Sequence, residues 1–151
     1  MKITKISCSF RPIPQRDSVR GRYTNYLTKK QIAQQNMFES AILEQCSYLF
    51  VGGVFVFYEL IFRVPKGTPT KKKALMLSGD IMRDITPDRV NCEDFLDNRL
   101  KNTIIEDDSK IIFGGSIKRW GLKDETVIYI AQAENTYSAI DFCKLVMDMV
   151  L

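Results

Sequence analysis

The sequence predicts an α/β (α+β) fold, a single domain in which one mixed β-sheet is flanked by helices. The chain has 151 residues, a length that suits one domain with a real hydrophobic core. Its apolar fraction of 45% and charged fraction of 26% are ordinary for a globular protein. Segments with strand-like alternation are interleaved with segments of helical periodicity, and this order is typical of helices packed on a sheet.

The charge and hydropathy of the chain narrow the functional classes only slightly. The net charge of +4 and the isoelectric point of about 8.9 are compatible with nucleic acid binding, although many unrelated proteins share them. The longest apolar run, Val54 to Val64, is interrupted by Glu59 and Arg63 and is too short to cross a bilayer. No signal peptide is visible, so we expect a cytoplasmic protein with no membrane partner.

Four widely spaced cysteines and the complete lack of histidine argue against a zinc site. The chain contains no C-x-x-C pair, and each cysteine lies near apolar residues, as small buried hydrophobic residues do. A reducing compartment is the default expectation for such a pattern. The four residues are Cys8, Cys46, Cys92 and Cys143.

A strand followed by a basic loop opens the chain. Ile3 to Phe10 alternates loosely and predicts the strand. The loop carries two prolines and interleaves arginines with tyrosines, which is typical of a segment that follows a phosphate backbone. An ordinary exposed loop explains the same residues. The arginines of this loop are Arg11, Arg16, Arg20 and Arg22.

The next elements are predicted to be a long helix and a central strand. Thr28 is a suitable N-cap, and apolar residues at helical spacing continue to about residue 49. Gly52-Gly53 interrupts that pattern. The segment from Val54 to Val64 is apolar on both faces, as expected for a strand in the middle of a sheet.

A short helix with three adjacent lysines follows a loop between Pro65 and Pro69. Its cap is predicted at Thr70 and its end at Gly79. Positive charge in the first turn opposes the helix dipole, and contact with phosphate is one reason to accept this conflict. Solubility is the other reason. The three residues are Lys71, Lys72 and Lys73.

The stretch from residue 86 to residue 112 holds two acidic groups separated by a segment of helical spacing. Asp88, after Pro87, is a suitable N-cap for this helix. The chain then turns back toward a strand, and we expect this return to bring Asp88 and Asp108 close together. Asp94 lies one helical turn past Val90 and is expected to face the same spot.

Clustered carboxylates need a cation or a shared proton. Two of them about 4 Å apart repel by roughly 4 kcal/mol at an effective dielectric of about 20. Ligands that are all oxygen favour magnesium, or alternatively manganese. A solvated helix face followed by a turn is the simpler interpretation of the same residues.

The last third of the chain predicts two strands and a helix. Lys110 to Arg119 and Thr126 to Ala131 are expected to form a hairpin, with Gly114-Gly115 as a bulge or bend. Residues 135–151 form an additional amphipathic helix after a main domain of residues 1–134. We expect this helix to cover a sheet edge or to build a dimer contact.

The acidic stretch resembles the core motif of RusA-like Holliday junction resolvases, which reads roughly K-P-D-x-D-N-x-x-K, then a helix, then D-D-S-Q and a strand. PDRVN and EDDSK match this motif without a gap between them. Asp88 and Asn91 take the positions of the first aspartate and the asparagine, and Asp107-Asp108 take those of the closing pair. There are two departures, since Val90 replaces the second aspartate and Asp94 replaces the lysine.

The resemblance covers roughly residues 3–131 and extends beyond the acidic motif. YLTKK, residues 26–30, is similar to the Y-T-P-K-K that precedes the long helix in the family, although the proline is missing. Several family members also carry a K-K-K element between the central strand and the aspartate motif. The resemblance implies the compact RusA-like fold, a homodimer, and a phage or prophage context.

The function that this resemblance implies is a magnesium-dependent endonuclease that resolves branched DNA, such as four-way junctions, in recombination and repair. Its catalytic residues would be Asp88, Asp94 and Asp108. Its metal ligands would be Asp88, Asp94, Asp107 and Asp108. Its DNA-binding residues would be Arg11, Arg16, Arg20, Arg22, Lys71, Lys72, Lys73 and Arg83.

Two other functions fit the same sequence. The departures at Val90 and Asp94 favour a degenerate relative that binds branched DNA without cutting it. The apolar C-terminal helix alternatively favours a protein-interaction domain that does not bind DNA. The steep salt dependence of phosphate contacts distinguishes these two alternatives.

Overall fold

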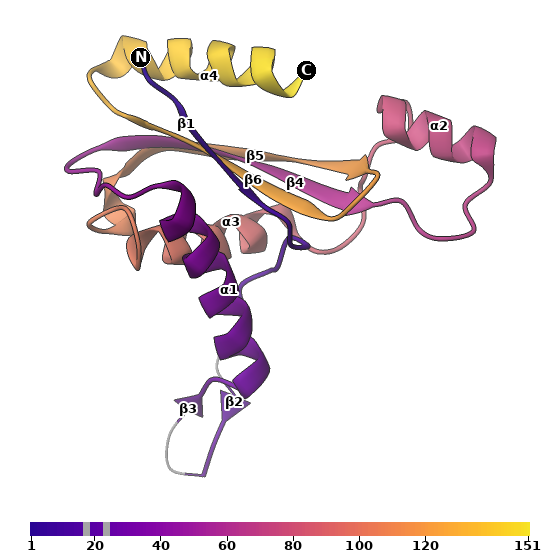
Figure 1. Cartoon of the computed structure of the whole chain (residues 1–151), viewed down its shortest axis with the longest axis horizontal. Helices are drawn as coiled ribbons and strands as arrows, with labels where there is room; N and C mark the ends of the chain where they lie inside the picture. The colour runs from indigo at the N-terminus through magenta and orange to yellow at the C-terminus, as the bar shows by residue number, and fades with distance from the viewer. Residues whose placement is uncertain (17–18, 23–24) are drawn as a thin grey trace.

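The computed structural model describes residues 1–16, 19–22 and 25–151, without the side chains of Val19, Arg20 and Thr136. Helices lie on both faces of one mixed sheet, with α4 on one face and α1 and α3 on the other (Figure 1). The predicted α/β architecture with an additional C-terminal helix is therefore confirmed. The described helices are α1 (Lys29–Gln45), α2 (Thr70–Ser78), α3 (Arg89–Lys101), α4 (Thr136–Val150) and the short 3-10 helix η1 (Asp108–Lys110).

The sheet has the strand order β1-β6-β4-β5 in the described part of the chain. The central strand β4 is parallel to β5 and antiparallel to β6, and β6 is also antiparallel to β1. The first nine residues of β4 are buried, as the apolar run predicts. The strands are β1 (Thr4–Cys8), β4 (Val54–Arg63), β5 (Ile111–Gly121) and β6 (Glu125–Gln132), with a separate ladder of β2 (Val19–Arg20) and β3 (Asn25–Tyr26).

The predicted hairpin between the last two strands is wrong. A short turn joins β5 to β6, but β4 lies between them and pairs with both. A strand that is apolar on both faces is best buried in the middle of a sheet, and pairing with both β5 and β6 gives β4 that position. The turn instead crosses the end of β4, where Asp124 Oδ1 accepts a hydrogen bond from the backbone N–H of Arg63 at 2.9 Å.

The helix ends follow the capping rules with one exception. Thr28 and Gln31 form a capping box at the start of α1, and Asp88 accepts a hydrogen bond from the Val90 N–H at the start of α3. Gly79 ends α2 in the left-handed conformation with φ 88°. The predicted cap at Thr70 is wrong, because this residue is the first of the helix and Pro69 precedes it without a side-chain cap.

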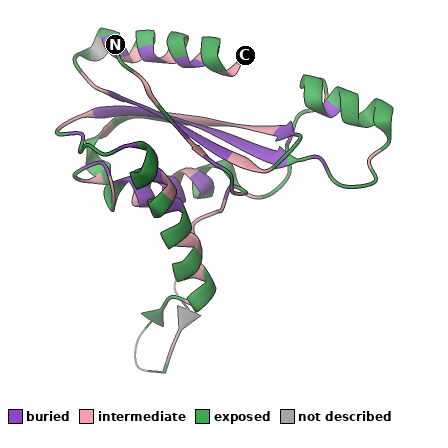
Figure 2. Cartoon of the chain, viewed as in Figure 1, coloured by how far each residue is buried: buried purple, intermediate pink, exposed green. Residues whose placement is uncertain are grey.

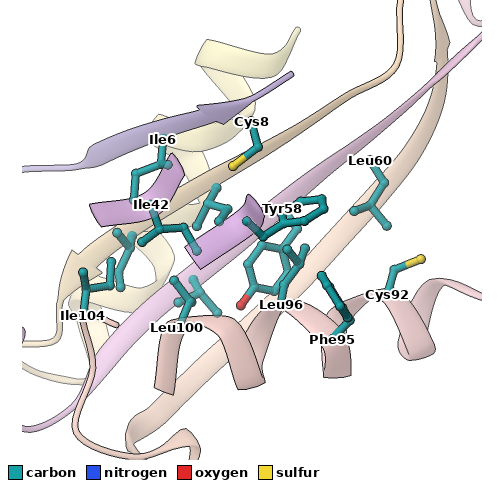
Figure 3. Close-up of a cluster of buried hydrophobic side chains, with 14 of the residues drawn as sticks. Ile6, Cys8, Ile42, Tyr58, Leu60, Cys92, Phe95, Leu96, Leu100 and Ile104 are labelled. Carbon is teal, nitrogen blue, oxygen red and sulfur yellow. The ribbon is translucent and has the colours of Figure 1, made fainter. Parts of the chain in front are cut away.

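Two hydrophobic cores lie on the two faces of the sheet, and Figure 2 shows the buried residues concentrated in its strands. The larger core packs α1 and α3 against the first face, with Ile42, Tyr58 and Leu100 among its members (Figure 3). The smaller core packs α4 against the second face, where the rings of Phe55 and Phe142 lie 5.8 Å apart. The C-terminal helix therefore packs on the same sheet as the rest of the chain.

None of the helices in the described residues combines the length and the apolar character that crossing a membrane requires.

Candidate nucleic-acid interface

The first motif aspartate lies at the amino end of α3. Asp88 Oδ1 accepts a hydrogen bond from the Val90 N–H at 2.8 Å and is thereby used as the N-cap. Lys118, near the carboxyl end of β5, donates to the carbonyls of Ile85 and Pro87 at 2.8 and 3.2 Å. These contacts fix the start of α3 against the far end of β5.

The closing pair of aspartates lies at the opposite end of the same helix. Asp107 Oδ2 and Asp108 Oδ1 lie 3.5 and 3.8 Å from Nζ of Lys101, the last residue of α3. Asp107 also caps η1, and hydrogen bonds from Ser109 lower the pKa of this carboxyl group. These roles are those of a helix cap and a surface ion pair.

The expected approach of Asp88 to Asp108 is therefore wrong. The thirteen residues of α3 make a helix about 20 Å long, and the two aspartates are held at its opposite ends. The antiparallel return occurs as predicted, but β5 begins beside the end of α3 and reaches its start only near Lys118. The direction of the return thus separates the two motif aspartates.

The four predicted metal ligands do not fit a single magnesium ion. Magnesium is bound at about 2.0–2.1 Å with near-octahedral geometry, which ligands at both ends of a helix cannot provide. Asp94 is exposed between the two ends, and its backbone carbonyl accepts a hydrogen bond from Asn98 at 2.9 Å. Among the residues that the structure describes, no three histidine, cysteine or carboxylate side chains are grouped to hold a metal ion.

Asp97 is the acid of this stretch that the sequence reasoning missed. Its Oδ1 accepts a hydrogen bond from the Tyr58 hydroxyl at 2.6 Å, and Figure 3 shows this hydroxyl pointing from β4 toward α3. Burial above all, and then the charges of Glu93, Asp94 and Asp108, raise the pKa of Asp97 to about 6, although the Tyr58 hydrogen bond lowers it. A tyrosine in the middle of an apolar strand needs a hydrogen-bond partner for its buried hydroxyl. This requirement could have predicted, from the sequence, that an acid of the neighbouring helix points into the core.

A cleft of about 900 Å³ lies where the basic loop meets the starts of α1 and α3. The backbone N–H of Gln15 donates to the Asn91 carbonyl at 2.7 Å and holds the loop against α3. Two motif positions, Asp88 and Asn91, thus lie beside residues from the N-terminal part of the chain. The residues that line the cleft are Arg11, Pro12, Ile13, Pro14, Arg16, Thr28, Lys30, Gln31, Gln34, Thr86, Pro87, Asp88 and Asn91.

Positive charge dominates this basic cleft, because three cations and one carboxylate line it. Arg11 is partly engaged, since its guanidinium lies 3.4 Å from Asp124 and 5.1 Å from the Phe62 ring centroid. Arg16 and Lys30 are exposed and form no ion pair within the described residues. An open cleft with unneutralised arginine and lysine side chains is suited to phosphate groups.

One predicted DNA-binding residue is not available for DNA. Arg83 is 5% exposed, and it donates to the carbonyls of Ile85 and Thr86 at 2.8–2.9 Å. Its guanidinium carbon lies 3.6 Å from the Phe62 ring centroid and 4.8 Å from that of Trp120. The prediction that Arg83 contacts DNA is corrected, since the loop before α3 uses this side chain internally.

The other predicted DNA-binding residues are exposed, except for one whose side chain is not among those that the structure describes. Arg22 is exposed, and the side chain of Arg20 lies outside the described residues. The three lysines of α2 are exposed on a helix that projects beyond the end of β4 (Figure 1). None of the three lines the basic cleft.

A scan against models of known protein families finds no match, and a search of curated proteins finds none either. The RusA-like resemblance therefore rests on the motif residues themselves and stays a prediction.

Proposed function

We propose that this chain binds branched DNA through the basic cleft and does not cut it. The observation that carries this proposal is the convergence of Arg11, Arg16 and Lys30 on one open cleft beside Asp88 and Asn91. Arginine and lysine contacts to phosphates supply most of the affinity of proteins for DNA. The preference for branched DNA comes from the resemblance to the resolvases.

The separation of the motif aspartates supports the part of the proposal that concerns cleavage. Hydrolysis by a bound metal needs several oxygen ligands around one ion, and the motif aspartates lie at the two ends of α3. The departures from the motif at Val90 and Asp94 also argue against cleavage.

The test is binding of a synthetic four-way junction, compared with linear duplex, over a range of salt concentrations. The double variant Arg16→Gln with Lys30→Gln removes two charges from the cleft. The matched control, Lys2→Gln with Lys144→Gln, removes two exposed charges elsewhere. The slope of log K against log salt is negative, and each phosphate contact contributes about 0.9 to its magnitude. We expect the cleft variant to make this slope less steep by about 2. The control should leave the slope unchanged.

Cleavage is measured in the same reactions with magnesium or with a chelator. We expect intact junctions in both. Paired, magnesium-dependent nicks would overturn the non-cutting part of the proposal and favour an active resolvase. A failure to bind any DNA at low salt would overturn the whole proposal and favour the protein-interaction domain.

The proposed setting is the cytoplasm, with a phage or prophage origin suggested by the resemblance alone. In the described structure the four cysteines form no disulfide and three of them are buried, which supports a reducing compartment. A homodimer is part of the same proposal, because a four-way junction is close to two-fold symmetric.

A further inference from the structure

The turn between β4 and α2 encloses a second basic site, separate from the basic cleft. Three cations, Arg63, Lys66 and Lys73, line a cavity of about 230 Å³ there, together with Gly121 and Leu122 of the β5–β6 turn. The cavity has room for about eight water molecules at their volume in the liquid. A phosphate group with part of its hydration shell fits a space of this size.

The side chains of the three cations around this cavity are not paired with carboxylates in the described part of the chain. All three side chains are exposed, and none forms an ion pair with any residue that the structure describes. Asp124, the carboxylate of the adjoining turn, accepts from the backbone N–H of Arg63 and pairs with Arg11 instead. Three like charges around one cavity repel each other, and a bound anion removes this repulsion.

The start of α2 is positively charged and has no side-chain cap. Pro69 precedes the helix and supplies no side-chain cap, so the first N–H groups of α2 have no side-chain acceptor. The first turn also carries Lys71, Lys72 and Lys73, which oppose the helix dipole, and no acidic residue. Of these three lysines only Lys73 lines the cavity, so α2 contributes one cation to the site.

The sheet topology places the two basic sites at the same end of the molecule. Cys8 of β1 and Leu60 of β4 both pair with Thr126, so the two parallel strands end near each other. The basic loop leaves one of these ends and the β4–α2 turn leaves the other. Asp124 lies between them, since its Oδ1 contacts Arg11 of the first site and the backbone of Arg63 at the second.

We infer that the β4–α2 turn is a second phosphate-binding site, which holds a backbone phosphate of the same DNA that occupies the basic cleft. The DNA part of this inference rests on the proposed function. The phosphate part stands on the cavity and its three unneutralised cations.

The experiment measures junction binding against salt for the variant Arg63→Gln, Lys66→Gln, Lys73→Gln. The matched control is Lys2→Gln, Lys110→Gln, Lys144→Gln, which loses the same charge from exposed positions outside both sites. We expect the turn variant to lower the salt slope by about 1, equivalent to one phosphate contact, and the control to leave it unchanged. An equal slope for the two variants would overturn the inference.

A second measurement separates the binding of DNA from the binding of free phosphate. Inorganic phosphate is titrated into the wild-type protein, and the amide resonances of Gly67 and Leu122 are followed by NMR. Saturable shifts at these amides, absent in the turn variant, would support the site, and their absence would overturn it. If they occur in a protein that binds no DNA, the phosphate site stands and the proposed function fails. If only the cleft variant weakens DNA binding and no shift occurs, the proposed function stands and this inference fails.

Discussion

Burial acts against the charge of Asp97, whose carboxylate accepts the Tyr58 hydroxyl at the edge of the larger core. The pKa of Asp97 is raised to about 6 from the ordinary value of 3.8, mainly by this burial. The folded protein therefore holds the Asp97 proton more tightly than the unfolded chain does. The stability that this residue contributes is fully present below pH 3.8 and is lost as the pH rises through about 6.

The variant Asp97→Asn tests this linkage. Asparagine can still accept from Tyr58 through Oδ1 but carries no charge, so the loss of stability above pH 6 should disappear. We expect the melting temperature of the variant to exceed that of the wild type at pH 7–8, and the two to converge near pH 4. Calorimetry between pH 4 and 8 measures the difference, with Asp148→Asn on α4 as the control for removal of an exposed carboxylate. A difference in melting temperature that is constant over this range would contradict the prediction.

At the scale of elements, the β5–β6 turn contacts the basic loop through an ion pair between Asp124 and Arg11. Asp124 holds Arg11 at 3.4 Å through a contact between partly exposed side chains, and it also accepts from the Arg63 N–H. Asp124→Asn keeps an acceptor for that N–H while removing the charge that competes with DNA for Arg11. Exposed ion pairs are worth about 0.2–1 kcal/mol, so we expect junction binding to tighten by a factor of about 1.4 to 5.

Fluorescence anisotropy at a fixed salt concentration measures this change in affinity. Asp148→Asn is again the control, because it gives the same change in net charge on the opposite face of the sheet. Unchanged or weaker binding by Asp124→Asn would mean that Arg11 is not a DNA contact.

The elements themselves could largely be predicted from the sequence, whereas their neighbours in the sheet could not. The capping at Thr28 and Asp88 and the buried β4 follow from local patterns. The hairpin prediction failed because a short turn between β5 and β6 gives the same local signal whether or not another strand lies between them. The burial of Arg83 was equally hidden, since its aromatic partners come from β4 and the end of β5.

For the whole molecule, the parallel arrangement of β1, β4 and β5 places basic loops at one end of the sheet and acidic residues at the other. Both basic loops leave the sheet at one end, and the acidic segment Glu106–Asp108 precedes β5 at the other. The sequence indicated the individual charged segments and also the helix that separates the motif aspartates. The prediction that these aspartates meet did not take the length of α3 into account, and Asp88 and Asp108 therefore lie at its opposite ends.

Restoring the resolvase motif should therefore not restore cleavage. In the variant Val90→Asp with Asp94→Lys, the new aspartate lies beside Asp88, since Val90 is 49% exposed on the first turn of α3. Asp108 remains beside Lys101 at the other end of the helix. We expect the restored protein to bind four-way junctions and to leave them intact with magnesium, as judged by denaturing gels. Magnesium-dependent nicks that Asp108→Asn abolishes would contradict this expectation, because they would require the two ends of the motif to meet, either within one chain or between two copies.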